Sequence, residues 1–307
     1  MLSRFTTSLL CLMIAACSSP PPIPPRFDAL ERIPIHTALV HGQKIAYLDI
    51  GQGEPVVLIH GFGGSMWQWE HQQTTLSKYT RLITLDLVGS GLSDKPDIAY
   101  TPDDMLDFFV GFMDAVDLPR ATLVGNSMGA GLAIGMALTH PTRVTRLILI
   151  DGLPGNVMKK LTSPSIRRAL GTSAPSWLVS FGNWLFGGLM IESILKEIVH
   201  DPALLTPAVI ERSNRNRQQP GLVAPIMTVR DTIPLWESGF AMRLGEITHP
   251  TLILWGEEDR VFPIAVGEEL QRTIKGSQLV RIPKSGHIPQ WEQPAISNEA
   301  MVKFLRL

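Results

Sequence analysis

Short apolar runs alternate along the chain with segments of helical periodicity. Runs rich in Val, Ile and Leu predict β-strands, and eight of them lie at Thr37–Val40, Lys44–Asp49, Pro55–Ile59, Arg81–Asp86, Ala121–Gly125, Val144–Asp151, Thr251–Trp255 and Gln278–Ile282. Apolar residues spaced three and four apart predict helices at Gln68–Ser77, Pro102–Val116, Met128–Thr139, Pro263–Ile274 and Ala295–Leu305. This order predicts an α/β fold in which helices cover both faces of an eight-stranded, mostly parallel sheet.

One long stretch interrupts this alternation. Residues 154–245 contain no convincing strand pattern and hold three of the seven tryptophans. We therefore expect a helical lid at 154–245, inserted after the sixth strand. It separates one part of the core at 36–153 from a second part at 246–307.

The composition limits the classes of partner. Lys and Arg number 27 and Asp and Glu 28, for a net charge of −1, so the chain lacks the basic surface of a nucleic-acid-binding protein. With 45% hydrophobic residues it is a globular protein. Its two cysteines are Cys11 and Cys17, so the predicted domain contains neither a disulfide framework nor a thiolate metal site.

The first residues are typical of an export signal. Arg4 precedes a short apolar run, and Ile14-Ala15-Ala16-Cys17 resembles the bacterial lipobox. The resemblance implies cleavage of a signal peptide at 1–16 and acylation of Cys17, followed by a proline-rich tether at 17–35. We therefore expect an exported bacterial lipoprotein anchored to a membrane on the periplasmic or cell-envelope side. An ordinary signal peptide with a cysteine at its cleavage site is the alternative.

The motif with the clearest chemistry is Gly125-Asn126-Ser127-Met128-Gly129. It follows a predicted strand and opens a predicted helix, which is the context of a G-x-S-x-G nucleophile elbow. The flanking glycines allow a tight turn that presents the hydroxyl group of Ser127. A serine hydroxyl is a weak nucleophile, so a base and an orienting acid must accompany it.

We expect the base late in the chain. His287 follows the last predicted strand in Ser285-Gly286-His287, and Asp259 follows the seventh strand in Trp255-Gly256-Glu257-Glu258-Asp259. The order Ser127, Asp259, His287 is that of an α/β-hydrolase triad. Asp151, at the end of the sixth strand, is the competing acid.

Two backbone NH groups are needed to hold the oxyanion of a tetrahedral intermediate. We expect them from Met128, directly after the nucleophile, and from Phe62 in His60-Gly61-Phe62-Gly63-Gly64-Ser65. A phosphate-binding loop is excluded because this stretch has neither the Lys-Ser/Thr ending nor the G-x-G-x-x-G spacing.

Five ordered motifs resemble the α/β-hydrolase family: HGFGGS, DLVGSGLSDKP, GNSMG, WGEEDRVFP and SGHIPQWEQP. The resemblance runs from about Gln43 to the end of the chain except for the lid. It implies the α/β-hydrolase fold, a triad of Ser127, Asp259 and His287, and no cofactor. GNSM also resembles the branch that hydrolyses carbon–carbon bonds in ring-cleavage products, in which Asn126 and Arg212 would bind the dienoate. Ile288 departs from that branch, which usually has tryptophan there.

The lid sequence bears on the substrate. Trp177, Phe181 and Trp184 recur at helical spacing in a strongly apolar segment, and we expect that face to bind an apolar acyl group. The main hypothesis is therefore a membrane-anchored serine esterase or lipase acting on small-molecule or lipid-like esters through an acyl-enzyme. The alternatives are a carbon–carbon hydrolase of dienoates and a non-catalytic binding protein with the same fold.

Overall fold

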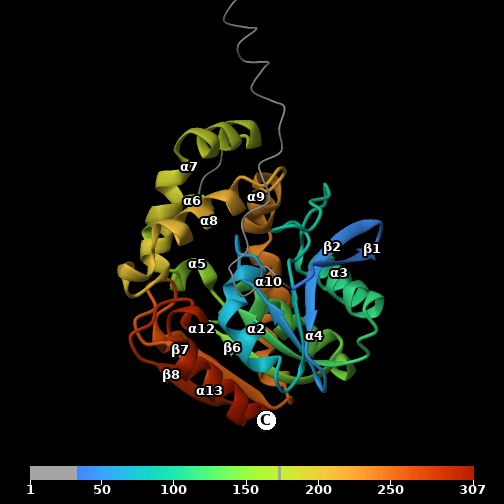
Figure 1. Ribbon diagram of the computed structural model, residues 1–307. Coiled ribbons are helices and arrows are strands. Elements are labelled where there is room, and N and C mark those ends of the chain that lie inside the picture. Colours follow the sequence, from blue (N-terminus) through green and yellow to red (C-terminus); the bar gives the residue numbers. More distant parts are fainter. Residues whose placement is uncertain (1–32, 172–173) are drawn as a thin grey trace, which may run out of the picture.

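An eight-stranded sheet lies at the centre of the computed structural model, which describes residues 33–171 and 174–307 (Figure 1). Its strands are β1 (His36–Val40), β2 (Gln43–Ile50), β3 (Pro55–Ile59), β4 (Arg81–Leu85), β5 (Ala121–Asn126), β6 (Val144–Ile150), β7 (Thr251–Gly256) and β8 (Gln278–Ile282). They lie in the order β1-β2-β4-β3-β5-β6-β7-β8. The β1–β2 and β2–β4 pairs are antiparallel and the others are parallel. The predicted α/β-hydrolase sheet is confirmed.

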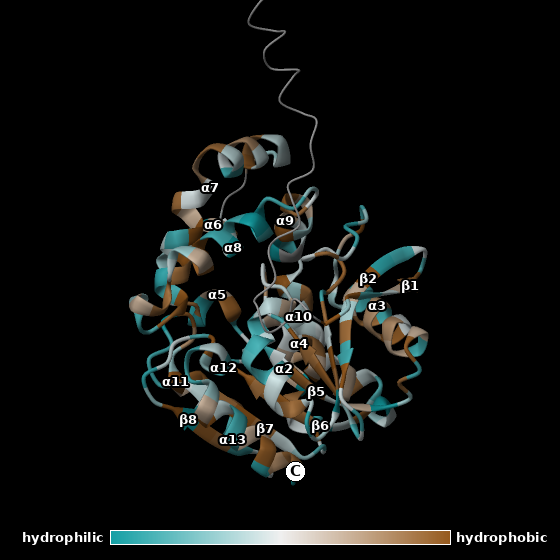
Figure 2. Ribbon diagram, viewed as in Figure 1, coloured by the Kyte–Doolittle hydropathy of each residue, from teal (hydrophilic) through white to brown (hydrophobic). Residues whose placement is uncertain are grey.

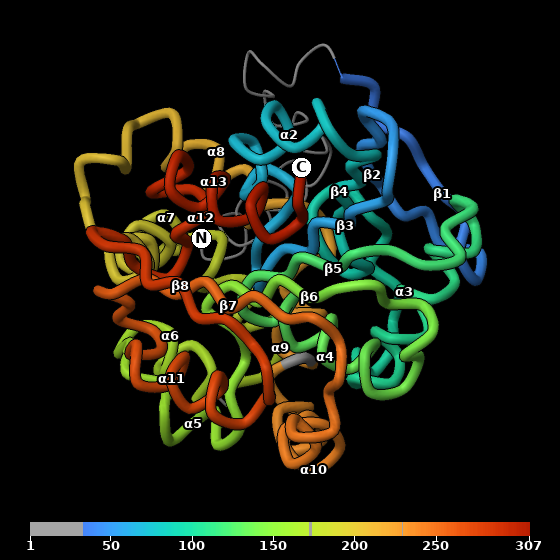
Figure 3. Tube along the Cα trace, turned by 90° about the horizontal axis from the view of Figure 1, so that it is seen from below, coloured from blue at the N-terminus to red at the C-terminus, as the bar shows by residue number. Residues whose placement is uncertain are grey.

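Helices cover both faces of this sheet. One face carries α2 (Glu70–Leu76) and α13 (Pro294–Leu305), and the other carries α3 (Pro102–Ala115), α4 (Met128–Thr139) and α11 (Ile264–Thr273) (Figure 3). Because successive strand residues point to opposite faces, Val57 and Ile59 pack with α3 and α4 while Val56 and Leu58 pack with α13. Burial on both faces explains the continuous apolar run of β3.

Short elements connect these parts. They are the 3₁₀ turns η1 (Met66–Trp69) and η2 (Pro141–Arg143) and the four-residue helix α12 (Pro289–Glu292). The helical pattern did not predict α12, because a single turn is too short to show periodicity.

Every regular element that the structure describes between β6 and β7 is a helix. It contains α5 (Val157–Lys160), α6 (Pro164–Gly171), α7 (Ser176–Ile198), η3 (Pro202–Leu204), α8 (Pro207–Arg217), α9 (Val223–Asp231), α10 (Ile233–Gly239) and η4 (Ala241–Glu246). In Figure 1 α7 lies at the end of the molecule opposite the chain's C-terminus. This insertion therefore lies over the edge of the sheet where the parallel strands end.

The predicted signal peptide and Cys17 lie outside the described residues, as does all but the end of the predicted tether. The described chain begins with Ile33, which packs with Ile35 beside Met66 and Leu92. Within residues 33–171 and 174–307, α7 is the one helix whose length and composition would suit a membrane span.

Candidate active site

Ser127 occupies a sharp turn between β5 and α4. Its backbone has φ 52° and ψ −117°, a conformation that is strained for a residue with a side chain. A Cβ atom on Gly125 would lie 2.3 Å from the backbone of Gly129, and one on Gly129 would lie 2.2 Å from the carbonyl oxygen of Ile59. The turn therefore requires glycine at both positions, and the packing against β3 holds Ser127 in the strained conformation.

His287 and Asp259 form a buried hydrogen-bonded pair. The ring Nδ1 of His287 donates to Oδ2 of Asp259 at 2.8 Å. The other oxygen of Asp259 accepts from the backbone NH groups of Val261 at 2.7 Å and Phe262 at 3.2 Å. These bonds fix the Asp259 carboxylate and leave Nε2 of His287 as the ring nitrogen available for proton transfer.

Asp151 lies beside this pair without bonding the histidine. One oxygen each of Asp151 and Asp259 and a ring nitrogen of His287 lie within 4.8 Å of one another. Burial, followed by the charge of Asp259, raises the pKa of Asp151 well above its usual range. Two carboxylates and an imidazole are also the kinds of ligand that bind metal ions. A protonated Asp151 next to a hydrogen-bonded histidine–aspartate pair is instead suited to acid–base chemistry.

Glu292 is a further buried carboxyl group near the same histidine. Its oxygens accept from the backbone NH groups of Gly286 at 2.8 Å and His200 at 2.6 Å. Burial raises its pKa to about 7. The backbone NH of His287 also donates to the carbonyl oxygen of Ile198 at 2.7 Å. The loop that carries His287 is thus attached to the end of lid helix α7 by two independent contacts.

The loop at residues 60–65 lies directly against the nucleophile. A Cβ atom on Gly61 would lie 3.2 Å from Cβ of Ser127. The NH of Phe62 has no acceptor among the described residues, and the NH of Met128 is in the first turn of α4, where no helical acceptor exists. Both NH groups are available to a ligand oxygen at Ser127.

His60 holds the base of this loop. Its Nδ1 donates to the carbonyl oxygen of Gly61 at 2.8 Å, and its Nε2 accepts from the NH of Leu87 at 3.0 Å. Complete burial lowers its pKa to about 4. His60 is therefore a neutral, fully bonded residue and has no free nitrogen for catalysis.

Asn126 and Arg212 occupy different surroundings. The amide nitrogen of Asn126 donates to the carbonyl oxygens of Ile150 at 3.2 Å and His287 at 3.0 Å, which ties the nucleophile turn to the histidine loop. Arg212 of α8 is buried, with its guanidinium 4.3 Å from the ring centre of Trp67 and 3.5 Å from Oε2 of Glu70. Burial lowers the pKa of Arg212 to about 10, so it remains a cation at neutral pH.

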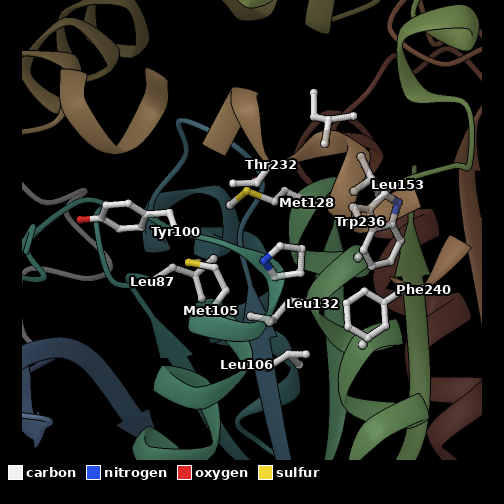
Figure 4. A pocket seen from close by; sticks show the side chains of 14 residues that line it. Leu87, Tyr100, Met105, Leu106, Met128, Leu132, Leu153, Thr232, Trp236 and Phe240 are labelled. Atoms are coloured by element: carbon white, nitrogen blue, oxygen red, sulfur yellow. The ribbon is translucent and has the colours of Figure 1, made fainter. Parts of the chain in front are cut away.

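An apolar cavity of about 80 Å³, with Met128 among its lining residues, lies between the core and the lid (Figure 4). The residues that line it come from the loop after β4, α3, α4, the start of the lid and the region of α10: Leu87, Tyr100, Pro102, Met105, Leu106, Met128, Gly131, Leu132, Gly135, Leu153, Thr232, Ile233, Trp236 and Phe240. Among the residues that the structure describes, no charged side chain lines it. The cavity is suited to an apolar group attached to a carbonyl at Ser127.

The three aromatic residues predicted to bind substrate lie elsewhere. Trp177, Phe181 and Trp184 are 71%, 54% and 71% exposed on α7, and none of them lines the cavity. The spacing predicted one face of a helix, but not the direction in which the face points.

Sequence reasoning did not single out Glu292 or the lid residues Trp236 and Phe240. Glu292 lies within a motif quoted for the family resemblance, five residues after His287. An acidic residue directly after Trp291, close to the candidate base, is the signal that was available there. Trp236 and Phe240 are one helical turn apart, and that spacing alone does not distinguish a cavity wall from ordinary packing.

Comparison with known proteins supports these observations. The family model described as the alpha/beta hydrolase fold matches residues 54–294. The chain is 31% identical to a 2-hydroxy-6-oxo-2,4-heptadienoate hydrolase of Pseudomonas putida over 80% of this chain and 86% of that protein. It is 30% identical to a 2-hydroxy-6-oxononadienedioate/2-hydroxy-6-oxononatrienedioate hydrolase of Paraburkholderia xenovorans over 85% and 90% of the two chains. A solved meta-cleavage product hydrolase from Pseudomonas fluorescens matches with a TM-score of 0.76 and 27% identity, covering 89% of this chain and 98% of that one.

These relatives correct the main functional hypothesis. The expected hydrolysis of apolar esters is contradicted, because proteins similar to at least 80% of the chain are named as hydrolases of a dienoate, of a dienedioate or trienedioate, and of a meta-cleavage product. The family motifs are shared by many hydrolases, and the elbow serves both ester and carbon–carbon cleavage. The motifs therefore could not separate the two reactions.

Proposed function

The chain belongs to the alpha/beta hydrolase family, and from that premise we propose that it hydrolyses a carbon–carbon bond in a 2-hydroxy-6-oxo-dienoate. The observation that carries the proposal is the 31% identity to a dienoate hydrolase across core and lid. Such a substrate has a carboxylate at one end and a carbonyl, bearing a further group, at the other. The site must therefore combine a cation with an apolar cavity.

Arg212 is the proposed partner of the substrate carboxylate. One turn further along α8, the side-chain amide of Asn216 donates to the carbonyl oxygen of Gly63 at 3.1 Å. That contact places α8 over the loop that lies against Ser127. A buried, charged guanidinium forms stronger hydrogen bonds with a carboxylate than with neutral groups. Glu70 balances its charge when no substrate is bound.

The apolar cavity is the proposed site of the group on the C6 carbonyl. Met128, which follows Ser127 in the chain, lines it, and no charged side chain of the described residues does so. A substrate carboxylate placed in the cavity would lose its hydration without gaining a hydrogen-bond partner. The cavity therefore favours the apolar end of the substrate over its carboxylate end. With the carboxylate at Arg212 and the apolar end in the cavity, the C6 carbonyl lies at Ser127.

The chemistry requires a stabilised carbon leaving group. A proton first moves from the C2 hydroxyl to C5, which leaves C5 attached to a C3=C4 double bond conjugated with a C2 carbonyl. Ser127 then adds to C6 while His287 takes its proton, Asp259 stabilises the imidazolium, and the NH groups of Phe62 and Met128 hold the oxyanion. When the C5–C6 bond breaks, its electron pair forms a C4=C5 double bond, and the displaced π electrons pass to the C2 oxygen near Arg212. That oxygen receives the proton from His287, so the released fragment is a 2-hydroxydienoate. Water deprotonated by His287 releases the acid from Ser127.

The experiment is the decay of absorbance of 2-hydroxy-6-oxo-2,4-heptadienoate with purified protein. We expect turnover by the wild type and none by Ser127→Ala. Arg212→Gln should raise KM by about 10-fold or more, because it removes a charge-assisted hydrogen bond. Arg215→Gln is the matched control, since Arg215 lies on the same helix and pairs with Glu211. A wild type that leaves the dienoate unchanged refutes the proposal.

A further inference from the structure

The first half of α7 is an apolar surface that nothing in the described chain covers. Trp177, Phe181, Trp184, Leu185, Phe186 and Leu189 are between 50% and 73% exposed. We call these six residues the α7 patch. Figure 2 shows apolar colour along this helix at the end of the molecule farthest from the sheet. Exposed apolar patches of this kind mark contact surfaces.

The second half of the same helix is held firmly by the protein. Leu195 and the following Val199 are buried with residues of α8 and α12, and the carbonyl oxygen of Ile198 accepts from His287. Gly187 allows the guanidinium of Arg217 to approach α7, where Nη1 donates to the carbonyl oxygen of Asn183 at 2.6 Å. These contacts hold the patch as a ridge on the lid.

The charges around the patch favour an anionic partner. No charged residue occurs from 169 to 191, whereas the lid at 154–245 has ten Lys and Arg against six Asp and Glu in a chain of net charge −1. Arg167 and Arg168 are exposed on α6, which packs against α7, and Arg217 lies beside Gly187. Tryptophan rings collect at membrane–water interfaces, and the arginines of the neighbouring helices can interact with anionic headgroups.

The location of Ile33 is consistent with docking on a lipid surface. Ile33 packs beside Met66 and Leu92, which follow the carboxyl ends of β3 and β4, the edge over which the lid lies. Fifteen residues separate Cys17 from Ile33, and they reach at most about 55 Å. An acyl group on Cys17, as the lipobox resemblance implies, would hold this edge of the sheet near a bilayer.

We propose that the α7 patch docks on an anionic lipid surface, with its aromatic side chains among the acyl chains and the neighbouring arginines at the headgroups. This docking is independent of the reaction proposed for Ser127. The α7 patch would add a second attachment to any acyl anchor, and two attachments bind a membrane far more stably than one.

The test is sedimentation of the full chain carrying Cys17→Ser, so that no acyl group contributes. Vesicles of phosphatidylcholine with phosphatidylglycerol should carry the protein down, and vesicles of phosphatidylcholine alone should do so less. Adding Trp177→Gln and Trp184→Gln should lower the partition coefficient by about 10-fold or more. Met242→Gln is the matched control, because Met242 is an 85% exposed apolar residue of the lid outside the patch.

Melting curves establish that the variants are folded, and dienoate turnover reports separately on the proposed reaction. Failure of the Cys17→Ser protein to sediment, or equal binding by the tryptophan variant, overturns the docking proposal. A dimer in light scattering that the tryptophan substitutions dissociate, without vesicle binding, also overturns it and assigns the patch to a second copy of the chain.

Discussion

Asp151 and Asp259 present two buried carboxyl groups to the same histidine, but Asp259 alone accepts the hydrogen bond from its Nδ1. The geometry makes Asp259 the orienting acid and gives Asp151 a neighbouring negative charge. Burial and that charge keep a proton on Asp151 over a wider pH range than usual.

The first prediction concerns this pair. Asp259→Asn should lower kcat by about 10⁴-fold, because the amide cannot stabilise the imidazolium and favours the wrong tautomer. Asp151→Asn should change kcat little, since asparagine resembles the protonated acid and still accepts from the NH of Gly256. Steady-state kinetics on the dienoate measures both. A crippled Asp151→Asn enzyme with a nearly normal Asp259→Asn enzyme would reverse the assignment.

The raised pKa of Asp151 also predicts a pH-dependent stability. An acid with a higher pKa in the folded state binds its proton more tightly there, so its contribution falls as pH rises above the unfolded value of 3.8. Asp151→Asn cannot ionise and should therefore become more stable relative to the wild type as the pH rises above 3.8. Urea unfolding at several pH values measures the difference. Asp97→Asn, at an exposed site, is the control and should show no such trend.

The sequence predicts the sheet and the elbow because local rules determine them. The strands of the core are buried on both faces, which leaves unbroken apolar runs such as Val56 to Ile59. Gly125 is dictated by its contact with Gly129 in the same turn, and Gly129 by the backbone of the adjacent strand β3. The choice between Asp259 and Asp151 depends instead on contacts between residues far apart in the chain. Both follow strands, and the side-chain rotamers that select Asp259 depend on packing between β6, β7 and the histidine loop.

The lid shows the limit of such rules most clearly. Periodicity predicts a helix through Trp177, Phe181 and Trp184, but an apolar face is equally compatible with a cavity wall and with an outer surface. Its direction is decided by contacts far apart in the chain, such as those of Glu292 with His200 and of Arg217 with Asn183. Substrate class depends on the same long-range contacts, and for this reason the ester hypothesis rested on the wrong residues.

Gly129 provides a test of the nucleophile turn. Gly129→Ala would place a Cβ atom 2.2 Å from the carbonyl oxygen of Ile59, so β3 or the turn must shift. We expect at least about 2 kcal/mol lower stability and a large loss of kcat, by analogy with other overpacked sites. Gly182→Ala is the control, since nothing lies within 4 Å of its Cβ position and alanine favours the helix. Chemical unfolding and turnover of both variants check the prediction, and equal behaviour would contradict it.

Glu292 is predicted to position the loop of His287. In Glu292→Gln a single side-chain oxygen remains to accept from the NH groups of Gly286 and His200, so one buried NH loses its acceptor. The expected cost is about 1 to 3 kcal/mol of stability. The variant should also lose the step in its pH profile that the carboxyl group, with a pKa of about 7, contributes. Urea unfolding and kcat against pH measure the two effects. Exposed Glu299→Gln should leave both unchanged.

The last prediction concerns the cavity lined by Met128, which is the proposed site of the group on the C6 carbonyl. Leu132 lines this cavity from α4, and Leu132→Phe would fill part of a space of about 80 Å³. Turnover of the methyl ketone 2-hydroxy-6-oxo-2,4-heptadienoate should change little, while kcat/KM for the corresponding phenyl ketone should fall by about 10-fold or more. Leu138→Phe, on the same helix but outside the cavity, controls for the larger side chain. If the cavity only reflects loose packing, Leu132→Phe will raise the melting temperature and lower kcat/KM for neither substrate.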